Sequence, residues 1–339
     1  MLIGNNFNAL LETRKIIHNT LDPLVTKGCS GILIDFPNHS NVGDSAIWLG
    51  EICYFKKRKC TIKYVCDYRN YKKLTIKRII KNTDVIFIHG GGNFGDLYPQ
   101  HQELRQILSI DFPNNRIIQL PQSINFTDFS GSNSSFEVLS RHKDFHLLVR
   151  DIKSYEIAKK HNMNLVYLCP DMALMLDINP LKIKTKSTDI VVLSRTDKEK
   201  VSAFKPDAPL KNKYQIIDWL GENSPKYEWL YDWAHKRLNW NSKVPLFILT
   251  HLAIFAANAM AKERLDRGLN ILGQGHVVIT DRLHALLLSW LGQAPVYFVD
   301  NNYGKLSNFT NTWLHNISNI EQCDDFEEAI DLAIRKINI

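Results

Sequence analysis

Short apolar strands that alternate with helical segments are the feature that most restricts the fold of this chain. The clearest instance is an apolar run at residues 276–280, a helical pattern at 281–292 and a second apolar run at 294–300. Neither apolar run alternates with polar residues, which is typical of parallel strands buried on both faces. Ligands of open α/β sheets bind beyond the carboxyl ends of the strands. The turn between the first strand and the helix is therefore a candidate site.

The same alternation recurs along most of the chain. We expect further strands over residues 31–36, 60–66, 85–88, 116–120, 145–149, 165–168 and 189–193, with helical segments between them. This order predicts the α/β class, with two Rossmann-like domains whose parallel sheets face a central cleft. Residues 179–188 are rich in Pro, Lys and Thr and predict a linker. We divide the chain into an N-terminal domain (1–180), a C-terminal domain (181–322) and a terminal helix (323–339) that could pack back on the first domain.

Composition places the chain among ordinary globular proteins. Its 339 residues are 45% hydrophobic and 23% charged, and the length suits two domains. The six cysteines are scattered without CxxC spacing, so we expect neither a zinc site nor a disulfide framework, but reduced thiols in a cytoplasm. No apolar run reaches membrane-spanning length without polar interruption, and the first residues lack the pattern of a secretory signal.

A net charge of +7 predicts an anionic partner without identifying it. The basic residues are not interleaved with aromatic ones as on a platform for single-stranded nucleic acid, so we expect no nucleic-acid partner. Much of the positive charge lies in residues 56–59 and 72–81. A solvated helix face is the more common interpretation of such segments. The other is a contact with anionic lipid headgroups, which would give peripheral association with the inner face of the membrane.

The turn after the strand at 276–280 combines three chemical resources. The first N–H groups of the helix attract an anion, Arg282 offers a planar fork for phosphate or carboxylate, and His284 can act as an acid or base near neutral pH. The alternative is that Arg282 pairs with Asp281 while His284 caps the turn. Arg150 and Arg195 also follow buried strands, so they are further candidates for an anion pocket.

Three glycines follow the strand at 85–88, in the order His89-Gly90-Gly91-Gly92. Glycines at such a place allow a positive φ and a close approach of backbone to ligand. A His-Gly-Gly-Gly element also occurs in esterases, but the accompanying Gly-x-Ser-x-Gly elbow is missing from the sequence. We interpret the turn as a wall of the cleft, with Asn93 and Asp96 available to hydroxyl groups. A tight turn without a ligand is the alternative.

Seven motifs together resemble the polysaccharide pyruvyl transferase family. In family order they are Asn41-Val42-Gly43-Asp44-Ser45-Ala46, His89-Gly90-Gly91-Gly92-Asn93-Phe94-Gly95-Asp96, Pro121-Gln122-Ser123, Val149-Arg150-Asp151 with Ser154, Cys169-Pro170-Asp171-Met172-Ala173, Thr280-Asp281-Arg282-Leu283-His284-Ala285 and Tyr303-Gly304-Lys305. Each motif alone is weak, whereas the ordered set over about residues 35–315 is specific. The resemblance implies an architecture similar to the GT-B glycosyltransferases. It also implies that phosphoenolpyruvate donates a pyruvyl group, which becomes a cyclic ketal on two hydroxyls of one sugar.

This chemistry assigns expected roles to the candidate residues. His284 is the candidate general acid/base, and Arg282 would stabilise the departing phosphate. Phosphoenolpyruvate carries a carboxylate and a phosphate, so it needs several cationic anchors. The expected donor-binding residues are Arg150, Arg282, Lys305 and the weaker candidate Arg195. The expected cleft and acceptor residues are Asn41, Asp44, His89, Gly91, Gly92, Asn93 and Asp96. The reaction requires no metal and no cofactor besides phosphoenolpyruvate as co-substrate, and Asp171 and Asp44 are expected to orient basic side chains or hold turns.

Two other functions fit the same sequence. A GT-B glycosyltransferase with a nucleotide-sugar donor would share the fold, and a catalytically silent scaffold of a polysaccharide assembly complex would share the motifs. The expected acceptor is a sugar of a cell-surface polysaccharide or of its precursor, linked to a polyprenyl diphosphate or to a nucleotide. The aromatic-rich residues 196–245 are where we expect that choice to be made. The sequence leaves open the acceptor sugar, the ketal stereochemistry and the oligomeric state.

Overall fold

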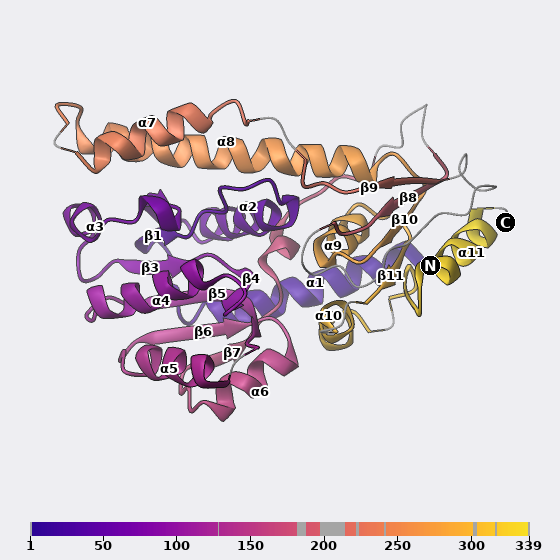
Figure 1. The fold of residues 1–339 in the computed structure, drawn as a ribbon, viewed down its shortest axis with the longest axis horizontal. Helices are drawn as coiled ribbons and strands as arrows, with labels where there is room; N and C mark the ends of the chain where they lie inside the picture. Colours follow the sequence, from indigo (N-terminus) through magenta and orange to yellow (C-terminus); the bar gives the residue numbers. More distant parts are fainter. Residues whose placement is uncertain are drawn as a thin grey trace.

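A computed structural model gives the fold of most of the chain. It describes residues 2–127, 129–181, 188–196, 214–221, 224–240, 242–300, 304–315 and 317–337. Two parallel sheets, of seven and five strands, are interleaved with helices (Figure 1). This confirms the predicted α/β class with two Rossmann-like domains.

The first sheet has the strand order β2-β1-β3-β5-β6-β7, and β4 pairs with the second half of β5. Its strands are β1 (Ser30–Ile34), β2 (Thr61–Cys66), β3 (Val85–Ile88), β4 (Gly91–Gly95), β5 (Ile117–Asn125), β6 (Phe145–Val149) and β7 (Val166–Leu168). After β2 is added on one side of β1, the chain crosses over and adds β3 on the other side. The carboxyl ends of β1 and β3 therefore form a topological switch point, where ligands of such sheets bind.

The second sheet has the order β12-β11-β10-β8-β9. Its strands are β8 (Ile190–Leu193), β9 (Tyr214–Ile217), β10 (Val277–Thr280), β11 (Val296–Val299) and β12 (Ile320–Cys323). The predicted strand–helix–strand unit is β10, α9 (Leu283–Leu291) and β11, and both of its strands are buried throughout. Because β9 and β10 flank β8 on opposite sides, the ends of β8 and β10 form a second switch point.

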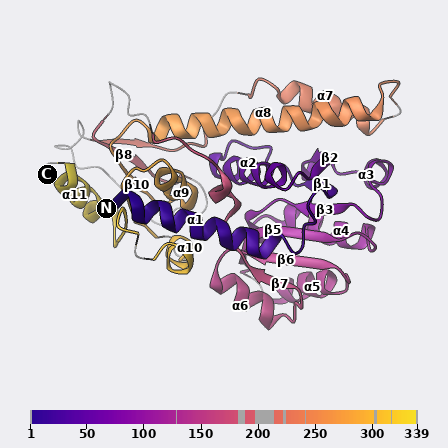
Figure 2. The same cartoon turned by 180° about the vertical axis from the view of Figure 1, so that it is seen from behind.

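Helices and a short 3₁₀ turn connect the strands of the first sheet, and a second 3₁₀ turn follows its last strand. They are α2 (Val42–Lys57), η1 (Tyr68–Asn70), α3 (Lys73–Ile79), α4 (Pro99–Asp111), α5 (Phe129–Ser140), α6 (Ile152–Lys160) and η2 (Met172–Met175). The first helix, α1 (Leu2–Leu21), crosses the back of the molecule (Figure 2). Arg14 of α1 donates to the carbonyl of Leu174 at 2.7 Å and pairs with Asp177 at 2.9 Å. These contacts hold α1 to the segment that ends the first domain.

Helices α7 (Glu228–Leu238) and α8 (Leu246–Leu272) form a hairpin that packs on the first domain, although they follow β8 and β9 of the second. The Tyr231 hydroxyl accepts from the Asp67 N–H at 2.9 Å, and His235 Nε2 lies 2.9 Å from the Val65 carbonyl. A single sequence boundary at residue 180 therefore does not describe the packing, since the first core includes helices from the second half of the chain.

The terminal helix α11 (Phe326–Ile337) packs on the second sheet, contrary to the expectation that it could return to the first domain. Its buried residues Phe326, Ala329 and Ile330 join Ile190 and Ile279 of that sheet in one apolar cluster. The reason is the short connection from β12, which keeps the helix beside its own sheet. Of the two helices that follow β11, it is α10 (Lys305–Trp313) that contacts the first domain, where its Trp313 Nε1 donates to the Arg150 carbonyl at 2.8 Å.

Candidate functional site

A cleft of about 470 Å³ lies where the carboxyl ends of the two sheets face each other. The predicted residues that line it are Asn41, Asp44, His89, Gly92, Asn93, Arg150, Arg195, Arg282, His284 and Lys305. They follow β1, β3 and β6 of the first sheet and β8, β10 and β11 of the second. Both switch points therefore contribute to one cavity, which gathers positive side chains from sequence positions far apart.

Arg150 is fully buried at the end of β6 and is held by two partners. Its Nη1 donates to Asp171 Oδ2 at 2.6 Å, and its Nε donates to Ser123 Oγ at 2.9 Å. Ser123 in turn donates to Asp151 Oδ2 at 2.7 Å. Within the described part of the chain, Arg150 Nη2 is a buried nitrogen without a hydrogen-bond partner. The guanidinium is thus fixed in place with one N–H group available to an anion.

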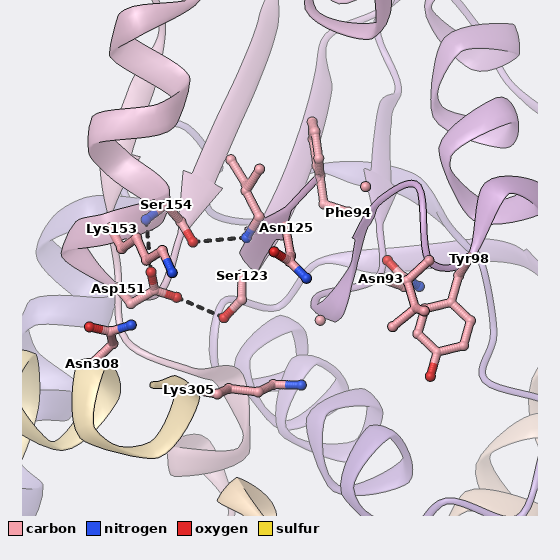
Figure 3. A pocket seen from close by; sticks show the side chains of 14 residues that line it. Asn93, Phe94, Tyr98, Ser123, Asn125, Asp151, Lys153, Ser154, Lys305 and Asn308 are labelled. Atoms are coloured by element: carbon pink, nitrogen blue, oxygen red, sulfur yellow. Dashed lines mark hydrogen bonds between the residues drawn. The ribbon is translucent and has the colours of Figure 1, made fainter. Parts of the chain in front are cut away.

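Gly92 separates Arg150 from Lys305. A Cβ at Gly92 would lie 2.9 Å from Lys305 Nζ and 3.1 Å from Arg150 Nη2, so both cations approach the same point. Lys305, at the start of α10, extends across a small cavity of about 50 Å³ that adjoins the cleft (Figure 3). Ser123, Asp151 and Asn308 lie on one side of this lysine and Tyr98 on the other. Glycine at position 92 therefore leaves space where two positive charges from different domains meet.

Arg282 is the N-cap residue of α9, and its side chain is almost completely buried. Its Nη2 pairs with the Asp218 carboxylate at 2.8 Å, and its backbone N–H donates to Thr280 Oγ1 at 3.0 Å. The neighbouring Asp281 accepts from the Arg195 N–H at 2.9 Å, and burial raises the pKa of Asp281 to about 6. The structure therefore shows Arg282 paired with Asp218, and not with Asp281 as in the alternative interpretation.

His284 lies in the first turn of α9 and contacts both domains. Its Nε2 is 3.3 Å from Asp171 Oδ2, the same oxygen that accepts from Arg150. Its ring packs so closely over Gly43 that a Cβ there would clash with it. Burial alone would raise the pKa of Asp171, but His284 and Arg150 hold that pKa well below its ordinary value. Asp171 thus remains an anion that orients both an imidazole and a guanidinium.

His89 forms a second pair of imidazole and carboxylate at the end of β3. Its Nδ1 lies 2.9 Å from Glu51 Oε2, and Glu51 Oε1 accepts from the Gly90 N–H at 2.8 Å. Both side chains are buried, and among the described residues His89 Nε2 has no hydrogen-bond partner. Burial raises the pKa of Glu51, whereas the pKa of His89 is raised because the nearby carboxylate outweighs the effect of burial.

Asn41 and Asp44 form the start of α2 beside the two histidines. Asn41 caps the helix, since its Oδ1 accepts from the Gly43 N–H at 3.0 Å and its Nδ2 donates to Asp44 Oδ2 at 2.9 Å. Burial alone would raise the pKa of Asp44, but His39, His284, His89 and Lys305 lower it. Asp44 is therefore a carboxylate close to three histidines and one lysine of the cleft.

Asn93 belongs to a buried polar network that sequence reasoning missed. Its Oδ1 accepts from Gln122 Nε2 at 2.8 Å and from Arg105, and its Nδ2 donates to Asp35 at 3.3 Å. Asp35 lies 2.8 Å from His101 Nδ1 and has a φ of 74°, an uncommon conformation for a residue other than glycine. Such strain at the end of a strand often accompanies a functional site.

Two predicted residues do not line the cleft. Gly91 has a φ of 127° and lies behind Asp44, where it allows the turn between β3 and β4. Asp96 accepts from the backbone N–H of Thr127 at 2.7 Å and from its hydroxyl at 2.6 Å. The structure thus places the Asp96 carboxylate at a loop contact and not on either cavity.

Sequence reasoning missed two further residues of the site, and other candidates lie outside the described residues. Glu51 is one charged residue within a helix, and Asp218 follows a strand in the irregular stretch 196–245, so neither had a local signal. Parts of that stretch and Tyr303 of the lysine motif lie outside the described residues. Among the residues that are described, no group of three or more His, Cys, Asp or Glu gathers in an arrangement that could hold a metal ion.

Comparison with known proteins adds an independent line of evidence. A sequence profile of the family described as polysaccharide pyruvyl transferase matches residues 41–303. Pyruvyl transferase 1 of Schizosaccharomyces pombe is 32% identical over 302 residues, which cover 84% of this chain and 69% of that protein. The Bacillus subtilis protein EpsO, provisionally named a pyruvyl transferase, is 28% identical over 313 residues, which cover 91% of this chain and 93% of that protein.

A solved structure shares the fold. It is that of a functionally uncharacterized protein from Klebsiella pneumoniae, with a TM-score of 0.56 and 20% sequence identity. The likeness covers 94% of this chain and 98% of the other. At this identity it supports the two-domain fold alone.

Proposed function

Because the chain belongs to the polysaccharide pyruvyl transferase family, we propose that it transfers the pyruvyl group of phosphoenolpyruvate to a sugar. The product is a cyclic ketal on two hydroxyls of one sugar residue, with release of phosphate. The observation that carries the proposal is the meeting of Arg150 and Lys305 at Gly92, in a cleft that also holds Arg282 and His284. A small donor with two anionic groups suits such a concentration of fixed cations.

The donor would bind between the two domains. Arg150 presents Nη2 and Lys305 presents its ammonium group toward the same point, so this pair is our site for one anionic end of the donor. Arg282 and the N-terminus of α9 lie across the cleft and are suited to the other end. We assign the phosphate to Arg282, since the helix N-terminus stabilises the charge that develops as phosphate departs.

His284 is the proposed general acid. The methylene carbon of the donor must gain a proton while C2 becomes electrophilic, and an imidazolium beside that carbon supplies it. The Asp171 anion, 3.3 Å from His284 Nε2, fixes the orientation of the ring. Positioned acid/base catalysis of this kind contributes ~10²–10⁴-fold in rate.

His89 is the proposed general base for the acceptor hydroxyl. Glu51 holds Nδ1 of the ring, so the proton of a hydroxyl would be taken by Nε2, the nitrogen without a partner among the described residues. The carboxylate stabilises the imidazolium that forms, as in other pairs of histidine and carboxylate. Two histidines with separate carboxylates can hold different protonation states, which a reaction that both adds and removes protons requires.

The atoms balance in two steps. In the first, one hydroxyl oxygen bonds to C2 and loses its proton to His89, while the methylene carbon gains a proton from His284 and becomes a methyl group. In the second, the bond between C2 and the phosphate oxygen breaks and the second hydroxyl bonds to C2. Of the two hydroxyl protons, one replaces the proton given to carbon, and the other leaves with phosphate.

The acceptor would occupy the remainder of the cleft. A volume of about 470 Å³ is within the range of sites that hold a small molecule and exceeds what the donor alone needs. Trp219, Tyr68 and His39 line this part, and an aromatic side chain can pack on the apolar face of a sugar. We propose a sugar of a cell-surface polysaccharide or of its lipid- or nucleotide-linked precursor, used in the cytoplasm at the inner face of the membrane.

Phosphate release tests the proposal directly. The purified chain is incubated with phosphoenolpyruvate and a panel of lipid-linked and nucleotide-linked sugars, and mass spectrometry of the acceptor follows. The expected result is phosphate release together with the mass of a pyruvate ketal on one acceptor. Thermal stabilisation by a UDP- or GDP-sugar and not by phosphoenolpyruvate would instead favour a GT-B glycosyltransferase. Binding to none of these anions would favour a silent scaffold.

A further inference from the structure

The hairpin of α7 and α8 carries large apolar side chains on its outer side. Exposed fractions are 66% for Trp229, 72% for Trp240, 65% for Phe247, 38% for Ile248 and 51% for Phe255. We call these five residues the aromatic face. Figures 1 and 2 show the hairpin along one edge of the molecule, with its outer side not covered by another element. Exposed patches of this kind mark contacts with a protein or a membrane.

The spacing of these residues is that of helices buried on one side only. On α7, Trp229, Trp233 and Arg237 follow one another at intervals of four, and the Arg237 guanidinium lies 4.2 Å from the Trp233 ring centroid. On α8, Phe247 and Phe255 are eight residues apart, which is close to two helical turns. The aromatic face is therefore drawn from the whole hairpin, with Trp229 on α7, Trp240 in the turn, and Phe247, Ile248 and Phe255 on α8.

A basic segment adjoins the turn of the hairpin. Residues 72–81 contain Lys72, Lys73, Lys77, Arg78 and Lys81 and no acidic residue. Thr75 in this segment donates to Asn239 Oδ1, in the turn of the hairpin, at 2.7 Å. Leu74 of α3 is 76% exposed, so the segment also presents an apolar side chain. Positive charge and exposed apolar groups thus occur side by side at this end of the molecule.

Within the described residues, α8 is the one helix long and apolar enough to cross a membrane by length and composition. Its inner side is nevertheless part of the core, where Leu249, Ala253 and Ala256 are buried and Arg264 donates to the Pro37 carbonyl at 3.1 Å. A spanning orientation would remove these contacts. The apolar residues that lack a role in the core are those on the outer side, so a helix lying along a surface is the arrangement that fits them.

A second copy of the chain is a less suitable occupant. A twofold-symmetric dimer could cover the aromatic face, but the five residues of that face include no acidic side chain that could pair with the basic segment. An anionic bilayer, in contrast, attracts lysine and arginine and accommodates tryptophan and phenylalanine at the boundary between headgroups and acyl chains. Both chemical properties of this end of the molecule are therefore matched by one partner.

We propose that the aromatic face and the basic segment dock the protein on an anionic lipid surface. The hairpin would lie parallel to that surface, with its aromatic side chains at the headgroup boundary and residues 72–81 over the phosphates. At its other end α8 supports a residue of the cleft, because Arg267 donates at 2.8 Å to the carbonyl of Trp219, which lines the cavity. The contact itself is independent of the proposed reaction; only its purpose, access to a lipid-linked acceptor, rests on that function.

Vesicle flotation with the full chain tests this docking. Vesicles of phosphatidylcholine alone are compared with vesicles in which half of the lipid is phosphatidylglycerol, at low and high salt. We expect binding to the anionic vesicles that weakens as salt rises, and little binding to the neutral ones. Lys77→Glu with Arg78→Glu should lower the partition coefficient at least ~10-fold, and Trp240→Ser with Phe247→Ser should also lower it.

Matched variants separate docking from general effects. Ile110→Ser removes a side chain of similar exposure (65%) on α4, outside the aromatic face and the basic segment, and should leave partitioning unchanged. Phosphate release with a water-soluble acceptor should be equal in all variants, so a failed reaction cannot be mistaken for failed docking. If the wild-type protein does not bind to anionic vesicles, the proposal is wrong. Light scattering that shows a dimer dissociated by Trp240→Ser with Phe247→Ser would also overturn it, in favour of a second copy.

Discussion

The two pairs of histidine and carboxylate in the cleft are built in different ways. His89 and Glu51 both belong to the first domain, and the hydrogen bonds that join them to each other and to Gly90 stay within it. His284 comes from the second domain, yet its carboxylate, Asp171, belongs to the first and also holds Arg150. The first pair depends on the packing of one core, whereas the second depends on how the two domains are placed. The proposed base is thus fixed within one domain, whereas the proposed acid is in position only when the two domains are together.

The largest expected effect comes from the histidine that spans the domains. His284→Ala should lower the rate of phosphate release by ~10²–10⁴-fold, because the proton donor for the methylene carbon is lost. His276→Ala, which removes an exposed histidine eight residues earlier, is the control and should behave as wild type. Equal activity in the two variants would show that His284 is not the acid.

Asp171→Asn should break the interdomain network and reduce stability. Arg150 would become a buried charge without its partner, which costs about 3–5 kcal/mol in the free energy of unfolding. The pKa of Asp171 is lowered in the folded state, so its stabilisation is present above the ordinary value of 3.8 and is lost as pH falls. Urea unfolding should show a difference in the free energy of unfolding between wild type and variant, and this difference should become smaller as pH decreases. A difference in the free energy of unfolding that grew as pH fell would contradict this electrostatic account.

Glu51→Gln tests the pair within the first domain. The variant keeps the shape of the side chain but removes the charge that raises the pKa of His89, so burial leaves that pKa lower. A base must be unprotonated to act, so the acidic limb of the rate profile should move to lower pH, and the maximal rate should fall ~10-fold because the base is weaker. Glu103→Gln, at an exposed position on α4, is the control. An unmoved acidic limb would argue against His89 as the base.

The smallest effect is expected at the point where the cations of the two domains meet. Gly92→Ala places a Cβ 2.9 Å from Lys305 Nζ and 3.1 Å from Arg150 Nη2. The flexible lysine can move aside, and the guanidinium has to shift by only a few tenths of an ångström, so we expect little loss of stability. The apparent affinity for phosphoenolpyruvate should fall by a few-fold, with kcat nearly retained, as measured by initial rates. Gly221→Ala adds the same group where, apart from its chain neighbours, no atom of the described residues lies within 4 Å, and it should change neither constant. A loss of kcat alone would mean that Gly92 does not adjoin the donor.

Local patterns in the sequence predicted the strands and helices that carry the residues of the cleft. The unit from β10 to β11 follows from its apolar runs and from the glycine that ends α9. The structure brings Arg150, Arg282, His284 and Lys305 to one cleft, because the carboxyl ends of parallel strands share an edge of a sheet. The chemical roles of these residues stay predictions.

Long-range pairing accounts for what the sequence did not predict. Glu51 reaches His89 across 38 positions, and nothing near either residue distinguishes that glutamate from others on helices. Periodicity shows that α8 has an apolar side, but it does not show which sheet that side covers. The position of α7 and α8 on the first domain therefore depends on tertiary packing. The same holds for the Asp218 partner of Arg282, which comes from the least regular stretch of the chain.

The length of α8 restricts how the protein can move. This helix of 27 residues contacts α2 and β2 of the first domain and also β8 and α9 of the second, so it acts as a splint between the two. A stiff rod anchored at both ends opposes wide hinge opening. Substrates would then enter a cleft whose width stays nearly constant. The rate of turnover would depend more on diffusion through the cleft entrance than on closure of the domains around the substrate.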